Sequence, residues 1–149
     1  MNWFSRHANL IEAGAAAITA LVALAALIGV KVQLDATDLQ QRTQSARDAY
    51  RSHLALASTS PDFASPTAAC QLLSSNNAGA YAAFVDHLLY SAEQMLEVEP
   101  GWEDTFVQAL LPHSEYMCSE IAPTGSTLET KRLLSGFKAQ YCTNVIPCL

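Results

Sequence analysis

The chain has few basic residues and no known catalytic motif. Its 149 residues include eight Lys and Arg against 14 Asp and Glu, giving a net charge of -6. This balance argues against nucleic acid or an acidic substrate as a partner. The sequence has no glycine-rich phosphate loop, no H-E-x-x-H and no G-x-S-x-G. We therefore expect a protein that is not an enzyme and binds no cofactor.

The sequence also lacks runs of Val, Ile and Thr that would indicate β-strands, and Ala and Leu dominate it. We predict an all-α fold in which an N-terminal transmembrane helix continues into a long helix, followed by a small bundle of about four further helices. Neither glycine nor proline occurs between Val30 and Pro61. The long helix should end near Ser60, because the residue before proline disfavours helix.

A long uncharged stretch covers residues 13–30, and Lys31 closes it. One helix of this length can cross a bilayer. The prediction is a tail over 1–8, a transmembrane helix over 9–31 and a helical extramembrane domain over 32–149. A cleaved signal peptide is the alternative, but the run is long and no A-x-A-like site closes it. We expect an uncleaved anchor.

The span is rich in small side chains at helical spacing. They include Ala16, Thr19, Ala20, Ala23, Ala25 and Gly29. Such residues allow another helix to approach closely in lipid. We expect membrane lipid and other transmembrane subunits as partners, and the alternative is an alanine-rich helix surrounded by lipid alone.

Apolar periodicity predicts the remaining helices. A stripe on the long helix is formed by Val32, Ala36, Leu39, Thr43, Ala46, Tyr50, His53 and Ala57. Further helices are expected over about 65–75, 81–97, 102–121 and 126–141. Ser65 should cap the first of these, and Pro112 should kink or split the third. Ser126 and Glu129 have the spacing of a capping box for the last.

Four cysteines, Cys70, Cys118, Cys142 and Cys148, all lie outside the span. Their long spacings exclude a C-x-x-C pair, and we expect no metal site. Two disulfides are predicted, with three connectivities open. Pairing Cys118 with Cys142 looks poor, because a hairpin of the last two helices would put them at opposite ends of the last helix. Four buried thiols in a cytosolic domain are the alternative.

The signals for membrane orientation conflict. Only Arg6 precedes the span, whereas Lys31, Arg42, Arg47 and Arg51 follow it, which favours a cytoplasmic domain. The cysteines favour an oxidising compartment, and most of these basic residues are mixed with acidic ones far from the interface. We expect an inner-membrane protein whose domain faces the periplasm.

Some polar and aromatic residues have a functional and a structural interpretation. Asp86, His87, Tyr90 and Glu93 resemble an acid–base group, but a solvated helix face explains them better. His53 and His113 fall on apolar stripes, which indicates core or boundary residues rather than ligands. The aromatic residues that would line a ligand pocket, if they are not simply core, are Tyr81, Phe84, Trp102, Phe106 and Tyr116.

The opening ANLIEAGAAAITALVALAALIGVKVQLDATDLQ, followed by a polar helix and a Pro-Asp stop, resembles a group of bacterial single-pass membrane proteins. In that group an N-terminal anchor continues through a V-Q into a small helical bundle. The layout from Tyr81 to Met95 and the later Trp102 are similar. No activity is established for the group, so the resemblance implies architecture only.

These observations predict a non-catalytic accessory or structural subunit of a larger membrane complex. Small single-pass subunits are common in respiratory and photosynthetic assemblies. The alternative is a membrane-anchored periplasmic module that senses or binds a ligand in a pocket between its helices.

Overall fold

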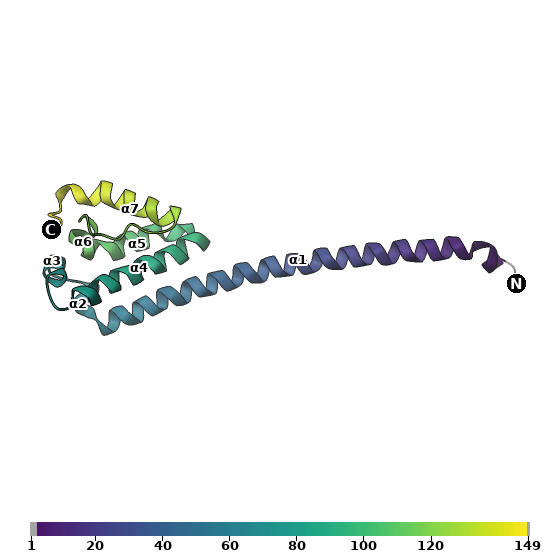
Figure 1. The fold of residues 1–149 in the computed structure, drawn as a ribbon, viewed down its shortest axis with the longest axis horizontal. Coiled ribbons are helices and arrows are strands. Elements are labelled where there is room, and N and C mark those ends of the chain that lie inside the picture. Colours follow the sequence, from purple (N-terminus) through teal and green to yellow (C-terminus); the bar gives the residue numbers. More distant parts are fainter. Residues whose placement is uncertain (1–2, 149) are drawn as a thin grey trace. The chain divides into compact units, whose positions relative to one another are not determined.

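The chain is all-α, as predicted. The computed structural model describes the backbone of residues 3–148 and the side chains of residues 12 and 14–148, and no strand occurs among them. The α-helices are α1 (Trp3–Thr59), α2 (Pro61–Ala64), α3 (Ala69–Leu73), α4 (Ala78–Val98), α5 (Glu103–Leu110), α6 (Ser114–Met117) and α7 (Leu128–Tyr141) (Figure 1). Short 3-10 turns are η1 (Pro100–Trp102), η2 (Leu111–His113) and η3 (Cys142–Asn144).

Two compact units divide the chain, Met1–Gln40 and Gln41–Leu149. The first unit is the N-terminal part of α1, which is already helical from Trp3 and so includes most of the predicted tail. Residues 1–2 of that tail and the side chain of Arg6 lie outside the described part of the chain.

The core of the second unit is built around α4. Its buried side chains recur every three or four residues, so one face of α4 is apolar along its whole length. They are Tyr81, Phe84, Val85, Leu88, Leu89, Ser91, Ala92, Met95 and Leu96. Helices α3 and α7 pack against α4, and α7 also contacts α5.

Residues 41–59 of α1 belong to the second unit and pack on its core. Ala46 and His53 are buried, and Tyr50 packs against the same core. Ser91 Oγ of α4 donates a hydrogen bond to the carbonyl of Ala49 at 3.2 Å, and Arg47 pairs with Glu99. The predicted apolar stripe is therefore confirmed for this segment, whereas Val32 and Leu39 are more than half exposed.

Two predicted helix starts are displaced. Ser65 is the C-cap of α2, and α3 begins only at Ala69. The cap of α7 is Thr127, whose side chain accepts from the Thr130 amide, so the predicted capping box at Ser126 is one residue early. The predicted kink at Pro112 is confirmed, because η2 separates α5 from α6 there.

The disulfides correct one prediction. Cys70 pairs with Cys148 and Cys118 pairs with Cys142, with Cα–Cα distances of 5.1 and 5.4 Å. The prediction that Cys118 and Cys142 pair poorly, because a hairpin of the last two helices puts them at opposite ends of the last helix, is therefore wrong. In the structure α6 ends at Met117, and the non-helical segment 118–127 spans the length of α7 before that helix begins. The end of α7 therefore returns to the end of α6.

Candidate functional site

The apolar segment of α1, residues 14–30, is exposed on every side. Ile18 and Leu27 project from opposite sides of the helix at 3.6 residues per turn, and both are more than 60% exposed. No residue in the most apolar window of α1 is buried. A helix that is hydrophobic all round needs an apolar environment around it. By length and composition this is the one helix in the described part of the chain suited to span a membrane.

The small residues of this segment form two faces. Ala16, Ala20 and Ala23 share one side with Thr19, since steps of three and four residues return to the same side of a helix. Thr19 Oγ1 donates to the carbonyl of Ala15 at 2.9 Å, so its hydroxyl is satisfied within the helix. Ala25 and Gly29 lie on the opposite side, where the same spacing forms a second, shorter face.

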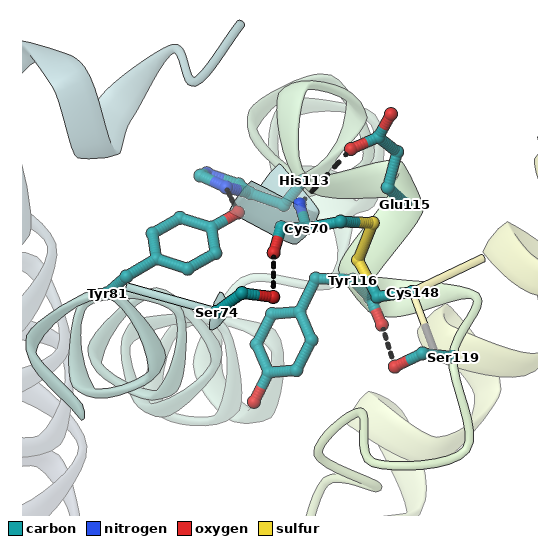
Figure 2. The surroundings of a disulfide bond; sticks show 8 residues. All are labelled: Cys70, Ser74, Tyr81, His113, Glu115, Tyr116, Ser119 and Cys148. Atoms are coloured by element: carbon teal, nitrogen blue, oxygen red, sulfur yellow. Dashed lines mark hydrogen bonds between the residues drawn. A yellow bond between two sulfur atoms is a disulfide. The ribbon is translucent and has the colours of Figure 1, made fainter. Parts of the chain in front are cut away.

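Glu115 holds both halves of the first disulfide (Figure 2). The Cys70 amide donates to Glu115 Oε2 at 3.3 Å, and the Cys148 amide donates to the Glu115 carbonyl at 3.1 Å. The two sulfurs and this carboxylate lie within 4.8 Å of one another, as metal ligands would. Because the sulfurs are bonded to each other, they supply no thiolates, and the cluster is a structural link.

The polar residues of α4 that resembled an acid–base group have different surroundings, and of the four only His87 and Tyr90 are in ring contact, with centroids 6.5 Å apart. Asp86 and Tyr90 are exposed, and His87 stacks on His53 with ring centroids 5.7 Å apart. Glu93 instead accepts hydrogen bonds from the amide and hydroxyl of Ser126. Burial pushes the pKa of Glu93 upward, but these hydrogen bonds and those of Thr130 and Thr127 outweigh it and hold the pKa below its usual value.

Most of the aromatic residues considered for a pocket are core. Tyr81, Phe84, Phe106 and Tyr116 are buried, and Trp102 packs at the edge, where its Nε1 donates to Glu99. Only Phe84 among them also lines the cavity described below.

Two buried histidines face this cavity from different elements. His53 on α1 is 5% exposed and His113 on η2 is 1% exposed. His53 packs on Phe84 with ring centroids 4.8 Å apart, and its Nδ1 has no hydrogen-bond partner among the described residues. His113 Nδ1 lies 2.8 Å from the Tyr81 hydroxyl, which fixes that imidazole ring (Figure 2).

Both imidazoles are uncharged at neutral pH. Burial, followed by the nearby His87, lowers the pKa of His53 to about 4. Burial, followed by the nearby His53, lowers the pKa of His113 to about 4 as well. Burial also raises the pKa of Tyr81, so its hydroxyl keeps its proton beside His113.

The cavity between these rings has a volume of about 270 Å³. Its lining comes from α1, α4, α5, η2 and the end of α2, and contains no Asp, Glu, Lys or Arg.

Helical spacing placed His53 and His113 on apolar stripes. No sequence signal pairs Tyr81 with His113, because 32 residues separate them.

No protein family, curated protein or solved structure matches this chain.

Proposed function

We propose that the protein is a non-catalytic accessory or structural subunit of a larger membrane complex, anchored by the apolar segment of α1. The observation that carries the proposal is the exposure of that segment on all sides. A helix without a polar face belongs inside the hydrocarbon rather than along a membrane surface. Once there, its small-residue faces suit close packing against other transmembrane helices.

The second unit supports a role outside the cytosol. Its two disulfides fit an oxidising compartment. We propose that this unit lies on the periplasmic side of an inner membrane, and that it adds a stable helical module to that face of the complex.

Co-purification of the full-length protein from membranes in mild detergent tests the subunit role. We predict that Ala20→Leu loses partners that the wild type retains, because a leucine on the longer small-residue face forces neighbouring helices apart. The comparison variant is Ala25→Leu, the same change on the shorter small-residue face. Circular dichroism should show both variants folded.

The outcomes separate the alternatives. Loss of partners by Ala25→Leu alone would move the interface to the shorter face. Retention of every partner by both variants would show that assembly does not use this helix. A wild-type protein that purifies without any partner would contradict the subunit role.

A second candidate is a membrane-anchored module that senses or binds a small molecule. The specific observation in its favour is the cavity that His53 and His113 line. A monomer that purifies with a bound small molecule, and without other subunits, would favour it.

A further inference from the structure

We propose that the cavity lined by His53 and His113 binds a small uncharged molecule that is mostly apolar and carries one hydrogen-bonding oxygen. The inference is independent of the subunit role, and it specifies the ligand class for the second candidate function. It rests on two buried imidazoles that face one apolar cavity from separate elements.

The residues that line the cavity determine the size and charge of the ligand. Apart from the two imidazoles and Ser65, the lining is aliphatic or aromatic, and it includes Tyr50, Leu54, Ala57, Phe84, Ala109 and Pro112. A cavity of about 270 Å³ suits a molecule built on a single ring. A charged ligand would give up part of its hydration and meet no opposite charge in the lining, which is unfavourable.

The imidazoles determine the polar end of the ligand. The contact between His113 Nδ1 and the Tyr81 hydroxyl orients the imidazole ring. The other ring nitrogen, Nε2, takes no part in this contact. The Nδ1 of His53 also has no partner among the described residues, but it is buried from solvent, so a ligand in the cavity would meet the other nitrogen of that ring. A neutral imidazole has one N–H donor and one lone pair, so a hydroxyl group can complement either ring nitrogen.

A metal ion fits this site less well. Among the described residues, the one group of three ligands whose donor atoms lie within 4.8 Å of one another is the Cys70–Glu115–Cys148 cluster. His53, His87 and His113 therefore do not converge on a common point, as the ligands of a stable metal site must.

The test uses the full-length protein in detergent micelles, with phenol as the probe and toluene as its counterpart without the hydroxyl. Phenol should shift the side-chain NMR resonances of His53 and His113 saturably and bind at least tenfold more tightly than toluene. Empty micelles provide the correction for partitioning of both probes.

Three variants test the location of the site. Ala109→Leu should fill the cavity and weaken phenol binding at least tenfold, whereas Ala83→Leu on the exposed face of α4 should change it less than twofold. His53→Phe keeps an aromatic ring but removes the nitrogens, so the preference for phenol over toluene should fall severalfold. Circular dichroism confirms that each variant is folded.

Three results would each overturn the proposal. They are the absence of a saturable shift at His53 in the wild type, equal binding of phenol and toluene, and full phenol binding by folded Ala109→Leu. If Ala109→Leu does not fold, the loss of preference in His53→Phe decides alone.

Discussion

At the scale of single residues, the buried histidines link stability to pH. The pKa values of His53 and His113 are about 4 in the folded protein, below the value of 6.5 for an exposed histidine. The unfolded chain therefore binds more protons between about pH 6.5 and pH 4. The stability that these neutral rings contribute is present above pH 6.5 and is lost as the pH falls through this window.

Chemical denaturation at a series of pH values checks this linkage. We predict that the free energy of unfolding falls by roughly 2 kcal/mol between pH 6.5 and pH 4, after allowance for solvent screening. The double variant His53→Phe, His113→Phe should show a smaller fall over the same range. An equal fall in both proteins would assign the pH dependence to other groups.

Glu93 is bonded to the start of α7 rather than being a free carboxylate of a solvated face. Its carboxylate accepts from Ser126 and Thr130 at the start of α7, and its pKa is lowered. Stability from this contact is present above the unfolded pKa and is lost as the pH falls through the lower folded pKa.

We predict that Glu93→Gln lowers the free energy of unfolding at pH 7 by about 1 kcal/mol, because a charged acceptor is replaced by a neutral one. Denaturant melts measure the change. Asp86→Asn, the corresponding change at an exposed position of the same helix, should alter stability by less than about 0.5 kcal/mol. Equal effects of the two substitutions would argue against a specific contact at Glu93.

At the scale of elements, close approach of α1 and the bundle depends on a small side chain at Ala46. This residue is completely buried, and Arg47 and Ser91 bond across the same contact. We predict that Ala46→Leu destabilises the second unit by about 1–3 kcal/mol through overpacking.

Thermal melts followed by circular dichroism measure this effect. Ala55→Leu is the matched control, since Ala55 is exposed on the same helix. Unchanged stability of Ala46→Leu would mean that residues 41–59 of α1 do not pack on the core.

At the scale of the whole molecule, the two disulfides close long segments of the chain. They join residues separated by 78 and 24 positions, and each crosslink of this kind typically adds about 2–4 kcal/mol. We predict that protein isolated with thiols blocked yields the peptides Cys70–Cys148 and Cys118–Cys142 and no free thiol. Reduction should lower the melting temperature.

Peptide mapping by mass spectrometry without reduction makes this measurement. Four blocked thiols would contradict both the disulfides and the proposed periplasmic location. A different pairing would contradict both the link between Cys70 and Cys148 and the path of segment 118–127.

The architecture followed from patterns that are local in the chain. The uncharged stretch of residues 13–30 marked the apolar helix, and helical spacing located α4 and most of α7 to within a few residues. Helix starts were less accurate. Ser126 bonds to Glu93 of α4 rather than capping α7, and this long-range contact is invisible to a local capping rule.

By itself the sequence determined the all-α class, the apolar segment suited to a membrane and the presence of enough cysteines for two disulfides. These properties depend on composition and on spacings of three or four residues, which act along the chain. Only the tertiary structure decided that Cys118 meets Cys142, that Tyr81 meets His113, and that two imidazoles face one cavity. Such pairings depend on the path of non-helical segments such as 118–127. Hydrophobic periodicity predicts helices but not the paths of the segments between them.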